Sequence, residues 1–164
     1  VGYTMAHFAV LYPRARIYGV ELDNGNVSMA RRNLARYGER VELVHGAVWD
    51  KDGTVEYGGE AAWGLHVLQS AAAEQAHLSA PAFRLSTLFS QWGLQTVDYL
   101  KMDIEGAEAP VLCDCADLAN SVLSIKVAVH APLTKAWCHD ALAGAGFDTA
   151  DFAGHAMCVI GIRS

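Results

Sequence analysis

The sequence has few charged residues, no excess of positive charge and no long apolar run. Only 18% of its 164 residues are charged, and 52% are apolar, whereas a typical domain has about a quarter charged residues. This composition excludes an intrinsically disordered chain, which has too few apolar residues to form a core. The net charge of -6 disfavours sequence-independent binding to nucleic-acid phosphates. No apolar run reaches the roughly 18 residues of a membrane span, so we expect a globular domain with neither nucleic-acid nor membrane partners.

The sequence also lacks the spaced ligand motifs of common metal sites. Its cysteines are Cys113, Cys115, Cys138 and Cys158, and the Cys-x-Cys pair has a poor chelating spacing with no second pair after it. The histidines show no His-Glu-x-x-His spacing. We therefore predict reduced thiols, a cytoplasmic location and no metal centre.

The start of the chain is unusual. It opens with Val1-Gly2-Tyr3-Thr4 and has no initiator Met, basic leader or small-residue cleavage site. This is not the pattern of a signal peptide, and it indicates a chain cut within an element. At about 150 residues per domain, we expect residues 1–164 to form one N-terminally truncated domain. Residues 58–82, rich in Gly, Ala and Ser, predict an insertion or loop with one short strand near Leu65–Leu68.

The first part of the chain has the pattern of a strand–helix–strand unit. Residues 16–21 predict a short buried strand that ends in a carboxylate, and residues 41–44 predict a second strand. Between them, Asp23, Asn24 and Gly25 supply the turn and N-cap residues of a helix, and Gly38 supplies its C-terminal stop. The apolar residues between the N-cap and the stop recur at helical spacing: Val27, Ala30, Leu34 and Tyr37. Such a unit is typical of a parallel sheet.

The rest of the chain continues this alternation. Residues 47–49 and 54–57 flank an Asp-Gly pair and predict a hairpin. Helices are expected at 86–93, 107–118 and 133–143, and strands at 97–103, 122–129, 146–152 and 155–162. The pattern favours an α/β fold with a doubly wound, mostly parallel sheet, in which ligands bind at the carboxyl ends of the strands.

The predicted strand ends carry a distinctive set of residues. They are Glu21, Gly46 with Ala47, Asp103 and His130, and we expect them to meet at one edge of the sheet. The two oxygens of a carboxylate such as Glu21, about 20 residues after the turn glycine Gly2, can accept both hydroxyl protons of a ribose. The alternative is a strand-end surface Glu and a helix-start glycine.

An acidic run follows the strand at 97–103. Strand alternation places Lys101 and Asp103 on one face, and Glu105 and Glu108 follow within the next turn. One interpretation is a carboxylate that faces a cationic or hydroxylated ligand. The other is an acidic helix start that complements the helix dipole, with Lys101 as a surface charge.

The run Val97-Asp98-Tyr99-Leu100-Lys101-Met102-Asp103-Ile104-Glu105-Gly106-Ala107-Glu108 resembles the signature of the FkbM family of S-adenosylmethionine-dependent methyltransferases. Other parts of the chain agree in order and spacing. They are Gly2-Tyr3-Thr4, Tyr12-Pro13, Val20-Glu21, Asn33-Leu34, Gly46-Ala47-Val48 and Asp52-Gly53-Thr54. The resemblance covers nearly the whole chain, apart from a first strand and its leading glycines.

The resemblance implies a Rossmann-like sheet whose last strand is antiparallel, and a methyltransferase that modifies hydroxyl oxygens of small molecules such as sugars and polyketides. Its cofactor is S-adenosylmethionine. Among the residues around it, the resemblance implies that Gly2 approaches the methionine part, Glu21 holds the ribose, Gly46 and Ala47 flank the adenine, and Asp103 lies near the sulfonium and the acceptor. The other cofactor-binding residues that it implies are Tyr3, Thr4, Leu22, Asp23 and Val48.

The chemistry needs a base, because an alcohol is a poor nucleophile at neutral pH. Asp103 and His130 are the candidates, and Lys101 could orient Asp103 or an oxygen of the acceptor. The ordinary pKa of His, about 6.5, lies nearer the operating pH than that of Asp. The site residue fixed by the signature is Asp103, as base, acceptor orienter or metal ligand. Oxygen ligands would also allow a divalent ion at Asp103, Glu105 and Glu108, although no spacing demands one.

Two other functions compete with this interpretation. A dinucleotide-binding Rossmann-like protein would share the strand-end acid, but it offers no reason for the acidic run at 101–108. An inactive, truncated domain could instead serve as an interaction module, and a sheet edge exposed by a missing strand would favour self-association. The expected partner in the first interpretation is a small hydroxylated acceptor.

Overall fold

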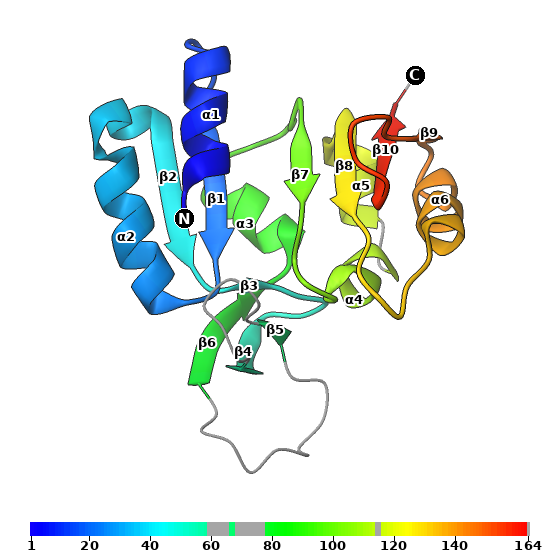
Figure 1. Cartoon of the computed structure of the whole chain (residues 1–164), viewed down its shortest axis with the longest axis horizontal. Coiled ribbons are helices and arrows are strands. Elements are labelled where there is room, and N and C mark those ends of the chain that lie inside the picture. The colour runs from blue at the N-terminus through cyan, green and yellow to red at the C-terminus, as the bar shows by residue number, and fades with distance from the viewer. Residues whose placement is uncertain (59–65, 68–77, 114–115, 164) are drawn as a thin grey trace. The chain divides into compact units, whose positions relative to one another are not determined.

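The computed structural model of the chain describes residues 1–58, 66–67, 78–113 and 116–163 (Figure 1). It divides into two compact units, each of which is built from two stretches of the chain. Unit 1 comprises Val1–Ala47 and Gly53–Ala82, and unit 2 comprises Val48–Asp52 and Phe83–Ser164. The chain therefore passes from one unit to the other three times.

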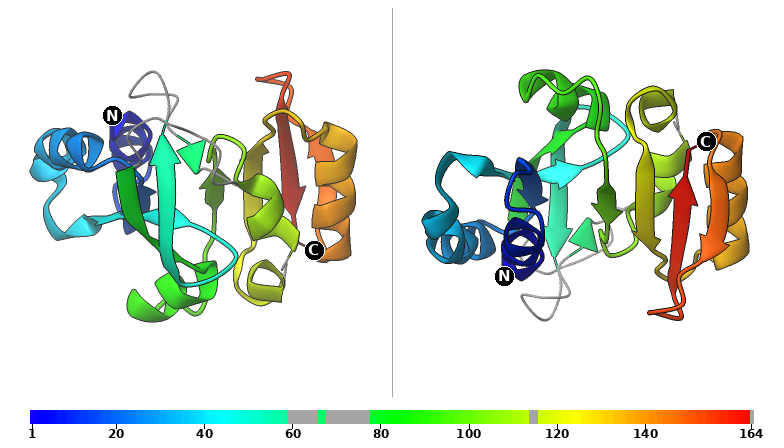
Figure 2. Two further views of the ribbon diagram at one scale, coloured as in Figure 1. Left: turned by 90° about the horizontal axis from the view of Figure 1, so that it is seen from below. Right: turned by 90° about the horizontal axis from the view of Figure 1, so that it is seen from above.

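Unit 1 contains the strand–helix–strand motif that the sequence predicts, preceded by one helix. Its elements are α1 (Tyr3–Leu11), β1 (Ile17–Glu21), α2 (Asn24–Leu34), the 3₁₀ helix η1 (Ala35–Arg40) and β2 (Val41–His45). β1 and β2 pair in parallel, from Ile17 opposite Val41 to Glu21 opposite His45. Figure 2 shows α1 and α2 against this pair of strands. The prediction of a parallel unit is thus confirmed.

Helix α2 forms where its apolar spacing predicts it. Asp23 caps its start, because the carboxylate accepts a hydrogen bond from the backbone N–H of Asn26 at 2.8 Å. Val27, Ala30 and Leu34 are buried on one face, one turn apart, as a helix that covers a sheet requires. Gly38 breaks the helical stretch inside η1, since its φ of 60° with ψ of -143° is not helical, and a further turn reaches Arg40.

The second sheet contradicts the predicted hairpin. β3 (Ala47–Val48), β4 (Gly53–Gly58), β5 (His66–Val67) and β6 (Leu78–Phe83) form a four-stranded sheet in the order β3-β6-β4-β5. β6 therefore lies between β3 and β4, and the two strands that flank the Asp-Gly pair do not pair with each other. The backbone N–H of Trp49 donates instead to the carbonyl of Phe83 at 2.9 Å.

The reason for this difference lies at Asp52. Its carboxylate accepts hydrogen bonds from the backbone N–H of Arg84 at 2.9 Å and from the hydroxyl of Thr87 at 2.7 Å. These long-range bonds hold the 49–52 segment against the start of α3, whereas a local turn would have directed it back along β3. A turn dipeptide predicts a hairpin only where no distant group competes for its side chain.

β6 is an element that the sequence reasoning missed within the 58–82 segment. It pairs antiparallel with β4, and Pro81 lies opposite Thr54. Ala80 and Ala82 are buried while Pro81 between them is exposed, so the strand alternates but with small side chains. The short strand expected near residues 65–68 is confirmed at His66–Val67. The remainder of that predicted loop, at 59–65 and 68–77, falls outside the described residues.

Unit 2 is built on a four-stranded sheet. Its elements are α3 (Leu85–Gln91), β7 (Leu100–Met102), α4 (Glu108–Cys113), α5 (Ala116–Ser121), β8 (Ser124–Ala128), α6 (Lys135–Gly144), β9 (Asp148–Asp151) and β10 (Cys158–Ile162). The strand order is β7-β8-β10-β9. β7 and β8 are parallel, and β10 runs antiparallel to both β8 and β9. The predicted antiparallel last strand is confirmed.

The core of unit 2 explains why these elements form. Met102 from β7, Val127 from β8 and Val159 from β10 are all buried in one apolar cluster, to which α3, α4, α5 and α6 also contribute. Figure 2 shows α6 running along β10 and β9. The helix predicted at 107–118 is confirmed over α4 and the first residues of α5, and residues 114–115 between them lie outside the described residues.

The chain is thus a mixed α/β protein. In the part that the structure describes, its strands form three sheets of two, four and four strands, whereas the sequence led us to expect one doubly wound sheet. Cys113, Cys138 and Cys158 form no disulfide among the described residues. Within those same residues, no helix is both long and apolar enough to span a membrane.

Candidate functional site

In unit 1, the end of β1 carries a half-buried carboxylate held by the following turn. Oε1 of Glu21 accepts hydrogen bonds from the backbone N–H of Asp23 at 3.1 Å and from the side-chain amide of Asn26 at 3.4 Å. From the described residues, Oε2 receives no hydrogen bond. Glu21 is therefore oriented through one oxygen and keeps acceptor capacity on the other, as a ligand with two hydroxyls would require.

Asp23 has a different position from Glu21. One oxygen caps α2, and the other accepts a hydrogen bond from the hydroxyl of Tyr57 at 3.5 Å. Burial, together with the charge of Asp23, raises the pKa of the Tyr57 phenol above its ordinary value, so this hydroxyl stays protonated and remains a donor. These contacts engage both carboxylate oxygens of Asp23 within the protein.

The residues at the start of α1 surround a close helix contact. Gly2 has a φ of 73°, and a Cβ at this position would lie 3.1 Å from the Cβ of Ala30 in α2. The glycine is therefore required by backbone conformation and by packing. Tyr3 is 74% exposed and Thr4 is also exposed, in the first turn of α1. Any part in binding a ligand would come from these exposed groups and from the free backbone N–H groups of that turn.

The residues that follow β2 fix the end of β1. The backbone N–H of Gly46 donates to the carbonyl of Glu21 at 2.9 Å, and Nε2 of His45 lies 3.1 Å from the carbonyl of Leu22. Ala47 is buried in β3, and Val48, half-buried, begins the first stretch of unit 2. The predicted residues Glu21, Leu22, Asp23 and Gly46 thus lie together in unit 1.

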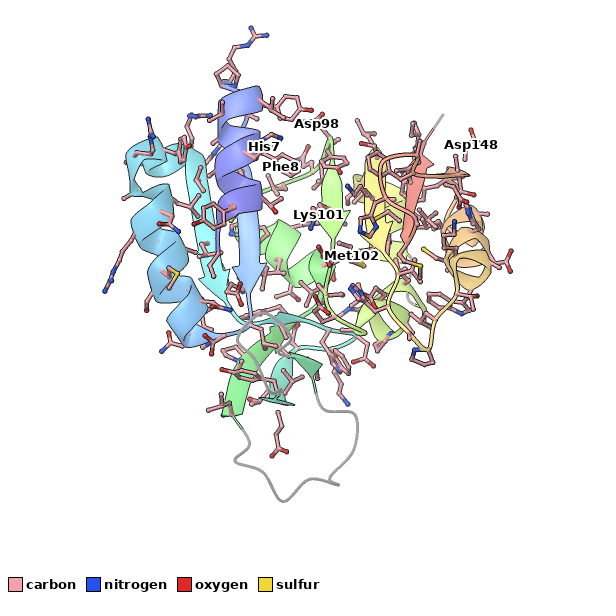
Figure 3. The ribbon with its side chains drawn as sticks, viewed as in Figure 1. His7, Phe8, Asp98, Lys101, Met102 and Asp148 are labelled. Carbon is pink, nitrogen blue, oxygen red and sulfur yellow. The ribbon has the colours of Figure 1, made fainter. Side chains whose placement is uncertain are left out.

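Unit 2 carries a second group of candidate residues, which begins at the end of β7. Lys101 and Met102 are neighbours on β7 (Figure 3), but Met102 is buried in the core whereas Lys101 is half-buried. The ammonium of Lys101 lies 2.6 Å from Oδ2 of Asp103, with which it forms an ion pair. Strand alternation therefore brings these two side chains together.

His130 follows β8 and makes a short contact with a buried carboxylate. Its Nδ1 lies 2.7 Å from Oε1 of Glu108, which is the first residue of α4. Glu108 is only 1% exposed, and the same oxygen also accepts a hydrogen bond from the backbone N–H of Ile104 at 3.4 Å. Because an ionised carboxylate only accepts, this geometry assigns the proton of the neutral ring to Nδ1.

The other ring nitrogen of His130 faces two more carboxylates. Nε2 lies 3.7 Å from Oδ1 of Asp103 and 3.6 Å from Oε2 of Glu105. One atom each from Asp103, Glu105 and His130 lies within 4.8 Å of the others, a spacing that a cation could also satisfy. Lys101 already neutralises Asp103 here, so the arrangement does not require an ion and we assign no metal to it. Glu108, which the sequence grouped with the acids of a metal alternative, contacts Nδ1 instead.

The electrostatics of this group favour a protonated ring. Burial of His130 by itself lowers its pKa, but the hydrogen bond and charge of Glu108, with the charges of Glu105 and Asp103, raise the pKa above the ordinary value of 6.5. A neighbouring anion stabilises the imidazolium. The ring is therefore suited to take up a proton and to hold it among carboxylates.

The loop that carries these acids has an unusual backbone. Glu105 has a φ of 52°, in the left-handed region that residues other than glycine rarely adopt, and Gly106 has a φ of 95°. A non-glycine residue in this region costs on the order of 1–3 kcal/mol, and such residues are common at binding and catalytic sites. The conformation turns the chain sharply after Asp103, so that Glu105 and Glu108 both reach His130.

The sequence reasoning identified Lys101, Asp103 and His130 but missed the role of Glu108 as the partner of Nδ1. It also gave no place to Asn26 and Tyr57, which hold the acids after β1. A buried glutamate in the first turn of a helix is unusual, but nothing in the local pattern connects it with a histidine that lies 22 positions away.

A protein-family model matches most of the chain. The methyltransferase FkbM domain aligns with residues 2–143, a range that contains both groups of candidate residues. No match is found among curated proteins or among solved structures.

Proposed function

Because this chain belongs to the FkbM family of methyltransferases, we propose that it uses S-adenosylmethionine to methylate a hydroxyl oxygen of a small molecule, such as a sugar or a polyketide. One observation supports a hydroxyl oxygen as the methylated atom: the imidazole of His130 lies among carboxylates after β7 and β8. An alcohol must lose its proton to become a good nucleophile, so its methylation needs such a base.

The group after β1 supports a nucleoside ligand. Glu21 is oriented through Oε1 and has acceptor capacity on Oε2, which suits the hydroxyl pair of a ribose. We propose that Glu21 binds this ribose with Leu22 beside it, and that Gly46, Ala47 and Val48 contact the adenine. Gly2, Tyr3 and Thr4 would approach the methionine part through the first turn of α1.

The group after β7 supports the handling of the acceptor. When bound, S-adenosylmethionine supplies an electrophilic methyl group with a good leaving group. The residues of the protein then have to position the hydroxyl and remove its proton. We propose that Asp103 helps to orient the acceptor and that Lys101 fixes Asp103 through the 2.6 Å ion pair.

A Rossmann-like methyltransferase fold is part of the proposal. That fold has parallel strand pairs and an antiparallel last strand. Its features here are the parallel pair β1–β2, which α2 connects along the chain, the parallel pair β7–β8 and the antiparallel β10. A doubly wound sheet would account for the order of these elements along the chain.

Calorimetric titration of the 164-residue chain with S-adenosylhomocysteine, beside an identical titration with NADH, tests the cofactor. We expect micromolar binding of S-adenosylhomocysteine and none of NADH. Binding of NADH alone would replace the proposal with a dinucleotide-binding protein. A chain that binds neither ligand, yet associates with itself as its concentration rises, would instead support an interaction module.

Transfer of a labelled methyl group from S-adenosylmethionine to a panel of monosaccharides and polyhydroxylated macrolides then tests the acceptor class. We expect the label in an ether linkage, which resists mild base, rather than in a base-labile ester. Label recovered in an ester or in an amine would contradict the choice of a hydroxyl oxygen.

A further inference from the structure

We propose that Glu108 and His130 form a catalytic pair. The buried carboxylate of Glu108 fixes the ring of His130, so that Nε2 takes the proton from the hydroxyl that is methylated. This inference rests on the proposed function and names the base that the sequence left open between Asp103 and His130. Glu108 is a positioning residue in this pair, since it acts on the reaction only through the ring.

The first step of the argument is the contact at Nδ1. A distance of 2.7 Å between Nδ1 and Oε1 of Glu108 is typical of a charge-assisted hydrogen bond. Because Glu108 is 1% exposed, water does not compete for this oxygen. The backbone N–H of Ile104 also donates to it and so limits its movement. The tautomer and the orientation of the ring are therefore both determined by one buried side chain.

The second step concerns Nε2. In the neutral ring this nitrogen carries a lone pair and needs a donor. The side chains that face it in the described structure are Asp103 and Glu105, at 3.7 and 3.6 Å, and both are acceptors. The side chain of His130 is 30% exposed. Nε2 is thus a reachable acceptor, and a hydroxyl placed there meets its lone pair directly.

The third step compares His130 with Asp103 as the base. Lys101 forms an ion pair with Asp103 at 2.6 Å, so this carboxylate is already engaged by a cation. Burial lowers the pKa of His130, but the carboxylates of Glu108, Glu105 and Asp103 outweigh it, because they stabilise the protonated ring. Of the two candidates, the imidazole is therefore better suited to accept a proton near neutral pH.

The transfer balances with these groups alone. As the hydroxyl oxygen forms its bond to the methyl carbon, its proton passes to Nε2 of His130, and the electron pair of the broken carbon–sulfur bond remains on sulfur. The products are a methyl ether, the thioether form of the cofactor and an imidazolium that faces Glu108, Asp103 and Glu105. Release of that proton to solvent restores the neutral ring.

Nitrogen-15 NMR of the full chain, labelled at histidine and without any added ligand, tests the pair directly. His130→Gln assigns the ring signals. We expect the neutral ring to carry its proton on Nδ1 and to titrate above the ordinary pKa. In Glu108→Gln, the pKa falls and the preference for the Nδ1 tautomer weakens.

Two further variants make the result specific. Glu105→Gln removes a charge near Nε2, so we expect a smaller fall in the pKa and an unchanged tautomer. Asp140→Asn removes an exposed charge on α6 and should leave both unchanged. A wild-type ring protonated at Nε2, or a Glu108→Gln ring that titrates like wild type, would overturn the proposal. So would ring signals that change when a chelator is added, since they would indicate a bound metal.

Turnover with an acceptor found in the methyl-transfer panel gives the second readout. We expect Glu108→Gln to lower kcat on the order of tenfold or more, with an unchanged Kd for S-adenosylhomocysteine, and to move the rising limb of the pH profile toward acid. A variant with wild-type kcat and pH profile would contradict the pair while the proposed function stands. Failure of the wild type to bind S-adenosylhomocysteine would contradict the proposed function, while the NMR result still decides whether Glu108 controls the ring.

Discussion

The ends of β1 and β7 share a pattern and differ in how their acids are held. After β1, Glu21 and Asp23 bond to the backbone of the next turn, to Asn26 and to Tyr57. After β7, the acids bond to a cation and surround an imidazole. Acids held by neutral donors are fixed in position and act as hydrogen-bond acceptors. Acids arranged around a titratable ring change the affinity of that ring for a proton.

This difference separates binding from proton transfer. A fixed acceptor suits a ligand that stays chemically unchanged, such as a ribose. A ring whose two nitrogens face different carboxylates suits a group that must gain and lose a proton. We therefore expect substitutions in unit 1 to change affinity for the cofactor, and substitutions after β7 to change the rate.

The largest effect is expected at Asp103. Asp103→Asn keeps the shape of the side chain but removes the charge that pairs with Lys101 and that orients the acceptor. We expect kcat to fall about 100-fold, the loss that follows when a reacting group is misplaced by about 1 Å. The Kd for S-adenosylhomocysteine should equal that of the wild type within experimental error. Steady-state kinetics and calorimetry on the same preparation measure both.

A fall in cofactor affinity with unchanged kcat would break the comparison, because Asp103 would then behave like Glu21. Asp98→Asn, also within the 97–108 signature but on the approach to β7, is the matched control, and it should retain wild-type kinetics.

The second effect is expected at Glu21. Glu21→Gln retains one acceptor oxygen but loses the charge, and we expect cofactor binding to weaken by about 1–3 kcal/mol, with kcat at saturating cofactor unchanged. Calorimetric titration with S-adenosylhomocysteine measures the change. Glu39→Gln, at an exposed position of η1, should bind like wild type. Equal affinity in a folded Glu21 variant would remove this residue from the ribose site.

The third effect concerns stability in each unit. Gly2 and Gly93 both have positive φ, at 73° and 66°, but only Gly2 has a neighbour that a Cβ would approach closely. Gly93→Ala should lower the free energy of unfolding by about 1–2 kcal/mol, because only the left-handed backbone conformation is then unfavourable. Gly2→Ala should cost more, because Ala30 has to move. Urea denaturation of both variants tests this order, and equal losses would show that α1 adjusts without strain.

The smallest effect is expected at Asp52. The backbone N–H of Arg84, followed by the hydroxyl of Thr87, holds the pKa of this exposed carboxyl below its ordinary value of 3.8. The resulting stabilisation is present above that value and is lost as pH falls through the lower folded-state pKa. Asp52→Asn should lower Tm slightly at pH 7 and have little effect in strong acid. A difference in Tm that is independent of pH would indicate that the contact does not depend on charge.

Sequence reasoning predicted the parts of the fold that depend on local pattern. The buried stripe of Val27, Ala30 and Leu34 on α2 follows from helical spacing, and the capping role of Asp23 follows from its position. β6 was missed because its inward residues, Ala80 and Ala82, are small and Pro81 lies between them, so apolar alternation is weak. The hairpin was wrong because Asp52 bonds to distant residues, which no local turn signal reports.

The candidate site was predictable to the same extent. Lys101 lies on β7 and Asp103 directly follows it, two positions on, so their proximity follows from the period of the predicted strand. The contact between Glu108 and His130 joins α4 to the end of β8 and depends on how these elements pack. The left-handed conformation of Glu105 is equally invisible in the sequence, since residues other than glycine rarely adopt it.

The threefold passage of the chain between the units has a consequence for its synthesis. Val48–Asp52 belongs to unit 2 but is made before Gly53–Ala82, which completes unit 1. During translation, domains fold as their residues emerge, N-terminal parts first. Val48–Asp52 must therefore wait, unpaired, until Phe83 and Arg84 have left the ribosome, and the order of folding runs back and forth along the nascent chain.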